Sequence, residues 1–340
     1  MKEFSGYRKG INLGGWLSQC IHSREHHESF ITENDINRIS QWGLDHIRLP
    51  FDYELIASEN GSFIEEGFSY IDRCVEWCGK HQLNVILDLH KTMGYTFDES
   101  SDAFFRNPVY QDRFISLWEE MARRYGKDHQ RISFELLNEV VDENVADIWN
   151  EIISRTIPAI RKVAPTIKIL VGGVRNNSVL WVRKLEAPYD ENVVYTFHFY
   201  EPLIFTHQSA YWVDKMPADF ITEYPMDFDT CVDETERFLP PMHREFYDKI
   251  RTNRVDQSFI KAAFADAVSA AAERNTALYC GEYGVIDKTL LPSALNWFSD
   301  ISSVFDEYGI SRAVWTYKAK DFGITDEHYS QIFDELIKLL

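Results

Sequence analysis

Eight short apolar runs are spread along the chain, and stretches with helical periodicity separate most of them. The runs are residues 10–13, 46–49, 84–89, 132–137, 167–171, 193–199, 278–281 and 313–315. Near-continuous apolar runs are typical of parallel strands that are covered on both faces. The main amphipathic segments are residues 35–42, 67–81, 111–125, 145–163, 259–274 and 291–308. Strands and helices alternating in this number predict an α/β fold, the (β/α)8 TIM barrel.

Residues 201–257, between the sixth and seventh expected strands, break this alternation. The segment is rich in proline, acidic and aromatic residues without strong periodicity, and loops of this length are usually functional or disordered. Its aromatic residues, which include Tyr211, Trp212, Phe220, Tyr224, Phe228, Phe238 and Phe246, make it too apolar for disorder. We therefore expect one domain over residues 1–340, with residues 201–257 as an inserted subdomain at the rim where such barrels carry their chemistry.

The charge balance limits the classes of partner. The chain has 35 basic and 54 acidic residues, a net charge of −19, which disfavours nucleic acids and anionic membranes and leaves neutral ligands such as sugars unopposed. No stretch approaches the roughly 18 apolar residues of a membrane span. The first residues show no apolar signal region, and the five cysteines are scattered and odd in number. These features predict reduced thiols and a cytoplasmic location.

Polar residues stand where the expected strands end, which is the end of a TIM barrel that carries its chemistry. In chain order they are Arg48, His90, Asn138 with Glu139, His198 with Tyr200, Glu282 and Trp315. Any one of them could simply mark the point where burial stops. Hydrogen-bonding side chains at the ends of so many strands instead favour a functional site at this end of the barrel. Glu139 and Glu282 also supply the two carboxylates that cleavage of a glycosidic bond requires, one as proton donor and one as nucleophile or base.

Short motifs around these residues resemble a known family. They are Asn138-Glu139 after an apolar strand, His198-x-Tyr200, Gly281-Glu282, His46-Ile47-Arg48-Leu49-Pro50, Leu87-Asp88-Leu89-His90 and Ala313-Val314-Trp315. Together they resemble glycoside hydrolase family five, within the clan of retaining (β/α)8 glycosidases. The opening segment, residues 10–16, is similar to the first strand of bacterial endoglucanases of clostridial type. The resemblance covers essentially the whole chain.

The resemblance implies a role for each carboxylate. Glu139 would be the general acid/base, which needs a raised pKa so that it is protonated when it meets the leaving oxygen. Glu282 would be the nucleophile and must stay ionised. Arg48 would lie near Glu282 and favour its charged form, and Tyr200 would donate a hydrogen bond to the same carboxylate. Retention predicts carboxyl groups about 5–5.5 Å apart, against about 6.5–9.5 Å for inversion.

The resemblance also implies residues that contact the sugar. Asn138 would hold the 2-hydroxyl of the substrate, a contact that tightens in the transition state. His90 and His198 would form hydrogen bonds with the sugar and with the surroundings of the nucleophile. Trp315 would be the aromatic floor on which the sugar stacks.

The function expected from these residues is hydrolysis of β-1,4-linked neutral glycans by a retaining, endoglucanase-like enzyme that acts on oligosaccharides without metal or cofactor. Glucose and mannose differ only in the 2-hydroxyl, so an exo-acting β-mannosidase or β-glucosidase and a mannan-oligosaccharide hydrolase stay open as alternatives. A catalytically inactive carbohydrate-binding barrel is a further alternative, since a fold alone does not establish activity.

Two further features of the sequence are weaker signals of function. His22-Ser23-Arg24-Glu25-His26 matches the zinc motif H-x-x-E-H, but it follows the first strand without the long helix that such a motif needs, so we expect a solvated polar loop. Trp16, Trp181 and Trp212 lie near strand ends or in residues 201–257, where they are candidates for additional sugar platforms.

Overall fold

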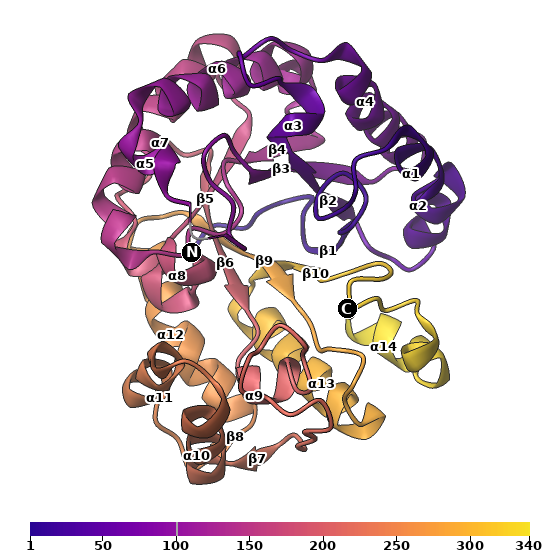
Figure 1. Ribbon diagram of the computed structural model, residues 1–340, viewed down its shortest axis with the longest axis vertical. Coiled ribbons are helices and arrows are strands. Elements are labelled where there is room, and N and C mark those ends of the chain that lie inside the picture. Colours follow the sequence, from indigo (N-terminus) through magenta and orange to yellow (C-terminus); the bar gives the residue numbers. More distant parts are fainter. Residues whose placement is uncertain (100) are drawn as a thin grey trace.

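A closed barrel of parallel strands forms the centre of the protein in the computed structural model, which describes residues 1–99 and 101–340 (Figure 1). The strands are β1 (Lys9–Asn12), β2 (His46–Asp52), β3 (Asn84–Lys91), β4 (Ile132–Glu135), β5 (Lys168–Gly172), β6 (Val193–Phe199), β9 (Ala277–Tyr283) and β10 (Ser311–Val314). Their order around the barrel is β1-β10-β9-β6-β5-β4-β3-β2, and pairing of β1 with β2 closes it. All the runs expected to be strands are strands, and the predicted (β/α)8 barrel is confirmed.

Six long helices correspond to the amphipathic segments of the sequence and surround the barrel (Figure 1). They are α2 (Glu33–Ser40), α4 (Glu65–Lys80), α6 (Pro108–Tyr125), α7 (Ala146–Val163), α12 (Gln257–Glu273) and α13 (Leu291–Tyr308). The shorter helices outside residues 201–257 are α1 (Arg24–Ser29), α3 (Tyr53–Ile56), α5 (Ala103–Arg106), α8 (Val174–Asn177) and α14 (Phe333–Leu339). Short 3-10 turns are η1 (Gly126–Asp128), η2 (Glu143–Val145), η3 (Val179–Lys184) and η5 (Glu327–Gln331).

Local sequence explains where the helices begin and end. At the start of α2 the carboxylate of Asp35 accepts hydrogen bonds from the backbone N–H and the hydroxyl of Thr32, which forms a capping box. Asn107 caps α6, and Pro108 opens that helix, where its missing N–H is no loss. Gly309 ends α13 in the left-handed region at φ 69°, a conformation that glycine adopts without strain.

Residues 201–257 have regular structure of their own. The segment contains α9 (Leu203–Thr206), α10 (Phe228–Phe238), η4 (Pro241–His243) and α11 (Arg244–Lys249). Its strands β7 (Met226–Asp227) and β8 (Arg254–Val255) pair antiparallel as a two-stranded sheet separate from the barrel. In Figure 1, α10, α11, β7 and β8 lie together beside α12 at one end of the molecule.

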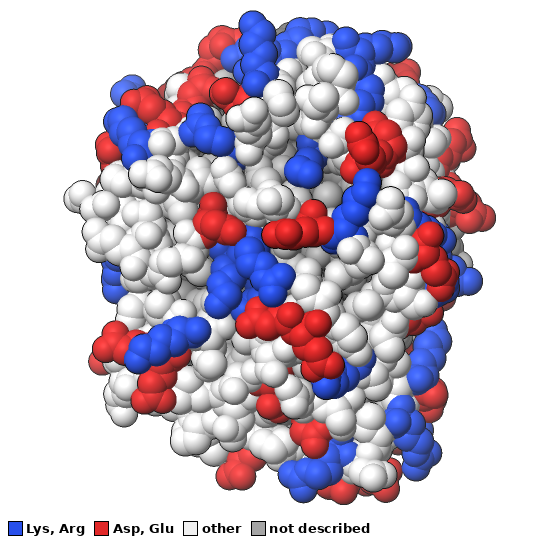
Figure 2. All heavy atoms as spheres, turned by 180° about the vertical axis from the view of Figure 1, so that it is seen from behind, with Lys and Arg blue, Asp and Glu red and all other residues white. Residues whose placement is uncertain are grey.

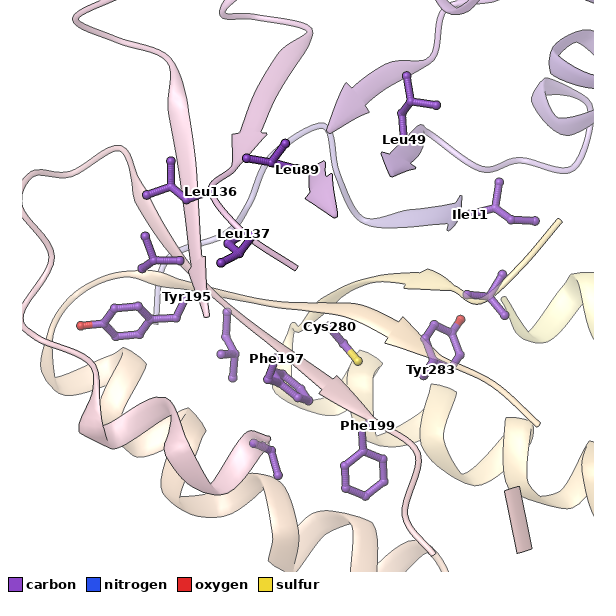
Figure 3. Close-up of a cluster of buried hydrophobic side chains, with 14 of the residues drawn as sticks. Ile11, Leu49, Leu89, Leu136, Leu137, Tyr195, Phe197, Phe199, Cys280 and Tyr283 are labelled. Carbon is purple, nitrogen blue, oxygen red and sulfur yellow. The ribbon is translucent and has the colours of Figure 1, made fainter. Parts of the chain in front are cut away.

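Side chains that point outward from the strands form the main hydrophobic core. Leu49, Leu89, Phe197 and Phe199 belong to it and are drawn in Figure 3. The rings of Phe197 and Phe199 pack against Phe264 of α12 with centroids 5.2 and 4.8 Å away. Burying these faces against the helices is the main driving force that holds the helical layer to the barrel.

The strands are buried on both faces, as their apolar runs predict, but the inner face of the barrel differs from the outer face in composition. Near the start of the strands an apolar cluster fills the barrel, with Phe4 stacked on Tyr7 at 4.3 Å and both packed near Tyr279. The layer above it is polar. It includes the fully buried side chains Asn12, Arg48, Asp88, Glu135 and Thr196. Along their strands these polar residues alternate with outward-facing apolar residues. Each is a single polar position within a run that is otherwise mostly apolar in the sequence.

The surface carries charges of both signs. On the face shown in Figure 2, acidic and basic side chains are interspersed and separated by wide uncharged areas. Among the residues that the structure describes, none of the helices combines the length and the apolar character needed to cross a bilayer.

We predict that Phe4→Ala lowers the unfolding free energy by about 3 kcal/mol, because it empties the lower barrel of a buried aromatic ring. Urea denaturation followed by fluorescence measures the change. The folded variant should keep its activity, since Phe4 lies at the opposite end of the barrel from the polar residues at the C-terminal ends of the strands. Val109→Ala on α6, where Val109 is 54% exposed, is the control and should change stability by no more than about 0.5 kcal/mol. Equal stability losses in the two variants would contradict the role of Phe4.

Candidate active site

The side chain of Arg48, which points into the barrel from β2, organises the polar layer. Its Nε and Nη2 donate to the two carboxylate oxygens of Glu135 at 2.7 and 3.1 Å. Nη2 also donates to Oδ1 of Asn138 at 2.8 Å and lies 3.1 Å from Asp88. Nη1 donates to Oδ1 of Asn12 at 2.9 Å and to Oε1 of Glu282 at 2.7 Å. A guanidinium with this many partners fixes the positions of five side chains, which come from four strands or their ends.

Burial and charge have opposite effects on Arg48. Removal from water disfavours its charge, but the carboxylates of Asp88, Glu135 and Glu282 outweigh this effect and keep its pKa well above the usual value. Burial raises the pKa of Asp88 to about 7, although Arg48 pulls in the other direction, and burial likewise raises the pKa of Glu135. The three carboxylates therefore depend on a single cation for compensation of their charge.

A β-bulge in β9 turns Glu282 into the barrel. In the pairing with β6, Phe197 lies opposite Cys280 but His198 lies opposite Glu282, so Gly281 is the extra residue. Without the bulge, strict alternation would place Glu282 on the outer face, because Cys280 already points outward. Glycine suits this position because an added Cβ would lie 3.0 Å from Nε2 of His198.

Two donors hold the carboxylate of Glu282. Arg48 donates to Oε1 at 2.7 Å, and the hydroxyl of Tyr200 donates to Oε2 at 2.9 Å. Both hydrogen bonds fix the orientation of the carboxyl group. Asn12 supports the same region, since its Nδ2 donates to the backbone carbonyl of Gly281 at 2.9 Å.

Glu139 has a different environment. Its Oε2 accepts a hydrogen bond from Nδ2 of Asn176 at 2.9 Å, and its Oε1 lies 2.8 Å from Nδ1 of His198. No cation contacts it among the described residues, and burial raises the pKa of Glu139 above its usual value. Burial also lowers the pKa of His198 to about 4, so the imidazole beside Glu139 is neutral at neutral pH.

The two carboxylates face each other across a short gap. An oxygen of Glu139, a nitrogen of His198 and an oxygen of Glu282 all lie within 4.8 Å of one another. This spacing fits the short separation of retaining glycosidases rather than the gap of about 6.5–9.5 Å that admits a water molecule between the carboxyl groups. The site thus pairs a carboxyl whose pKa is raised by burial with a carboxyl group fixed by two hydrogen-bond donors.

The other residues expected at the strand ends border this pair. Nδ1 of His90 lies 2.7 Å from Asp88, and burial lowers the pKa of His90 to about 4. The ring of His90 stacks on Trp315 with a centroid distance of 5.9 Å and an interplanar angle of 6°. Asn138 is oriented by its hydrogen bond to Arg48. The structure therefore brings all the strand-end residues singled out from the sequence to one end of the barrel.

A cavity of about 650 Å³ opens beside Glu139, His198 and Tyr200. Trp181 and Trp212 line it, together with residues of the 201–257 segment such as Leu239 and Phe246. Trp16 does not reach the site: it is fully buried and stacks on Trp77 at 6.2 Å, so its interpretation as a sugar platform is wrong.

Several residues of the site escaped the sequence analysis. Asp88 and Glu135 lie within apolar runs, where a buried charge is itself a signal, and Asp88 shares the strand face of His90 two residues later. Asn12 is likewise a buried polar residue within an apolar run, the one that forms β1. Asn176 gives no such signal, because it reaches Glu139 from α8, where Arg175, Asn176 and Asn177 all have φ between 55° and 59°.

Among residues 1–99 and 101–340, two groups of side chains have the composition of a metal site. Glu139, His198 and Glu282 form one, but the guanidinium of Arg48 lies 2.7 Å from Glu282, and its positive charge opposes a cation there. Cys20, His22 and His27 form the other, on the loop that follows β1.

The barrel and the paired carboxylates define a retaining glycoside hydrolase of the (β/α)8 type. The family described as "Cellulase (glycosyl hydrolase family 5)" matches residues 8–321. Among relatives, Cellodextrinase A of Ruminococcus flavefaciens is 46% identical over 92% of this chain and 86% of its own length. Endoglucanase C of Acetivibrio thermocellus is 38% identical over 98% of both chains. The chain belongs to glycosyl hydrolase family 5, as the sequence motifs predicted, and it is a retaining glycoside hydrolase.

Solved structures with low sequence identity share the fold. A hyperthermophilic endo-β-1,4-glucanase in complex with substrate is 23% identical, with a TM-score of 0.75 over 95% of this chain and 92% of its own. Cel5A of Thermotoga maritima, in complex with cellobiose, is 21% identical, with a TM-score of 0.76 over 98% of this chain and 97% of its own.

We predict that Arg48→Met lowers the unfolding free energy by about 3–5 kcal/mol at pH 8, because it leaves buried carboxylates without a cation. The loss should shrink toward pH 5. A buried carboxyl with a raised pKa binds its proton more tightly in the folded state, so stability falls as pH rises and recovers as pH falls. Denaturant unfolding at several pH values measures this.

Arg106→Met is the matched control, since the side chain of Arg106 is 77% exposed and its pairing with Asp102 is at the surface. It should leave the unfolding free energy almost unchanged at all pH values. A loss in Arg48→Met that grew toward acid pH would contradict the proposed dependence of Asp88 and Glu135 on Arg48.

Proposed function

We propose that this protein hydrolyses β-1,4-glucans by double displacement, with Glu282 as the nucleophile and Glu139 as the general acid/base. The single observation that carries the proposal is that two carboxylates within 4.8 Å have opposite surroundings. Glu282 accepts hydrogen bonds from Arg48 and Tyr200, whereas burial raises the pKa of Glu139. When two carboxyl groups are chemically identical, their surroundings decide which one acts as the acid and which one acts as the nucleophile.

In the first step, an oxygen of Glu282 attacks the anomeric carbon while Glu139 gives its proton to the leaving glycosidic oxygen. A covalent glycosyl-enzyme forms, and Glu139 becomes a carboxylate. In the second step, Glu139 takes a proton from water, the water attacks the same anomeric carbon, and Glu282 leaves as a carboxylate. Two inversions give net retention of the β configuration.

Further residues bind the sugar in this proposal. Because Oδ1 of Asn138 accepts from Arg48, its Nδ2 points elsewhere and is available to the 2-hydroxyl of the substrate. Trp315, backed by the parallel ring of His90, is the stacking surface for the sugar. His198 lies 2.8 Å from Glu139 and 3.6 Å from Glu282, where its Nδ1–H can donate to whichever carboxylate is charged.

Soluble oligosaccharides are the proposed form of the substrate. The relatives with the highest identity reported above are a cellodextrinase and an endoglucanase, which supports β-1,4-linked glucose units. We also propose that residues 201–257 are a subdomain inserted at the catalytic rim. Its separate two-stranded sheet and its share of the cavity wall beside Glu139 support this. Trp181 and Trp212 would be the platforms for the leaving part of the chain. A cytoplasmic location stays a prediction.

Product analysis tests the substrate. The enzyme is incubated with cello-, manno- and mixed-linkage oligosaccharides of defined length, and the products are separated by size. Internal cleavage of cello-oligosaccharides is the expected result. Release of single sugars from one end would replace this proposal with exo action, and a preference for manno-oligosaccharides would replace it with a mannan-oligosaccharide hydrolase. A lack of turnover on aryl β-glycosides would favour the inactive binding barrel.

We predict different rescue products for the two carboxylates. Glu282→Ala should abolish turnover, and azide in its place should convert an activated aryl β-glycoside to the α-glycosyl azide, since azide attacks from the vacated face. Glu139→Ala still forms the glycosyl-enzyme from an activated substrate, so azide should give the β-glycosyl azide. Proton NMR of the anomeric centre distinguishes the products. Glu186→Ala, an exposed glutamate, is the control. The same azide anomer from both variants would contradict the assignment.

We predict that Asn176→Ala shifts the alkaline limb of the pH profile of kcat/KM to higher pH. The hydrogen bond from Asn176 lowers the pKa of Glu139 against the effect of burial, so its removal lets the pKa rise further. The acid then stays protonated to higher pH. Asn144→Ala, an exposed asparagine in η2, should leave the profile unchanged. A shift to lower pH in Asn176→Ala would show that Glu139 is not the group that sets this limb.

A further inference from the structure

Three side chains with metal-binding atoms converge on the loop between β1 and α2. Nδ1 of His22 lies 3.1 Å from Nε2 of His27 and 3.9 Å from Sγ of Cys20. All three atoms lie within 4.8 Å of one another. We propose that Cys20, His22 and His27 form a binding site for a zinc-class divalent ion, a site that plays no part in the glycosidase reaction.

The distances suit tetrahedral coordination. A zinc ion binds sulfur at about 2.3 Å and nitrogen at about 2.0–2.1 Å, which places tetrahedral ligands about 3.3 Å (N to N) and about 3.6 Å (S to N) apart. The two observed distances differ from these values by a few tenths of an ångström. One thiolate and two imidazoles are also a ligand set that favours zinc over magnesium or calcium.

A buried carboxylate, that of Asp52, orients His22 from the side away from the cluster. Nε2 of His22, the nitrogen that faces away from the cluster, lies 3.1 Å from Oδ2 of Asp52. Asp52 is 3% exposed, and its other oxygen accepts a hydrogen bond of 2.5 Å from Ser18. A carboxylate that accepts the N–H of a ligating histidine fixes the tautomer and turns the free lone pair toward the metal. When the ion is bound, Nδ1 of His22 carries that lone pair.

The fold holds the ligands in place before any ion binds. Asp52 ends β2, and its backbone N–H donates to the carbonyl of Leu17 at 3.0 Å, so the loop is tied to the barrel. His27 lies in α1, is 5% exposed, and packs against Tyr70 with centroids 4.8 Å apart. The side chain of His22 is 29% exposed, which leaves a path for the ion from solvent.

This ligand set is not the H-x-x-E-H motif of the sequence. In that motif His22 and His26 would share the metal, but Nε2 of His26 lies 2.8 Å from the carbonyl oxygen of Gly15. Glu25 is exposed. His27, one residue beyond the motif, takes the place of His26. Three protein ligands leave a fourth position for water.

Binding has a simple proton balance. In the metal-free protein, a proton lies between His22 and His27 in their hydrogen bond, and Cys20 is a thiol that contacts the carbonyl of Trp16 at 3.2 Å. When the ion binds, the thiol of Cys20 loses its proton to solvent. The proton between the two histidines also leaves the nitrogens that face the ion: from Nδ1 of His22 it goes to solvent, and from Nε2 of His27 it is exchanged for one on Nδ1 of the same ring. No electron transfer and no co-reactant are involved.

Titration of the full-length protein with Co²⁺ and Zn²⁺, after treatment with chelator, tests the proposal. The expected result is one equivalent of Co²⁺ with visible d–d bands and a near-ultraviolet thiolate-to-metal band, displaced by Zn²⁺. Saturating Zn²⁺ at about 100 times its Kd should raise Tm by roughly 3–5 °C. Activity on an aryl glycoside, measured in parallel, should be the same with and without Zn²⁺, so this outcome is separate from the proposed function.

Variants locate the ion. Cys20→Ser should lose the thiolate band, His22→Gln should bind at least about tenfold more weakly, and Asp52→Asn should weaken binding about 10–100-fold. Glu25→Gln and His26→Gln are the matched controls from the same loop and should keep wild-type affinity. The proposal is overturned if wild type shows no thiolate band, or if Cys20→Ser and His22→Gln bind Zn²⁺ as wild type does.

Discussion

The buried guanidinium of Arg48 is the interaction on which the active site depends. It lies inside the barrel in contact with carboxylates from β3, β4 and β9, and it also fixes the amides of Asn12 and Asn138. A buried ion pair of this kind adds little to stability over an apolar core, but removal of one partner is strongly destabilising. The value of Arg48 is therefore positional: in the proposed mechanism it holds Glu282 where that carboxylate can attack a sugar, and it orients the amide of Asn138 toward the same sugar.

The proposed division of labour between the two glutamates follows from their distance to this cation. Glu282 contacts Arg48 directly, whereas Glu139 contacts the neutral His198 and Asn176, and burial raises its pKa. In the proposed mechanism, Glu282 therefore acts as a carboxylate and Glu139 as a proton donor, although oxygens of the two side chains lie within 4.8 Å of each other. The bulge at Gly281 is part of the same arrangement, because it aims Glu282 at Arg48 while the neighbouring residues of β9 keep their outward packing.

The sequence predicted the barrel well, because each strand is a compact apolar run and each long helix has a clear apolar face. Strand-end residues such as His90 and Tyr200 were found for the same reason, since a polar side chain directly after an apolar run is conspicuous. Asp88 and Glu135 were missed because they lie within such runs, where the outward-facing residues dominate the pattern. Asn176 depends on a left-handed turn, and Cys20 and His27 meet only through the path of a loop. Contacts of these kinds come from tertiary structure and not from local periodicity.

The most direct test of the central claim is to trap the covalent intermediate. The enzyme is incubated with an activated 2-deoxy-2-fluoro β-glycoside, whose fluorine slows breakdown of the glycosyl-enzyme, and the labelled peptide is identified by mass spectrometry after proteolysis. Covalent sugar on Glu282 alone is the predicted result. Sugar on Glu139 or Glu135 in its place would contradict the arrangement in which Arg48 and Tyr200 hold the attacking carboxylate.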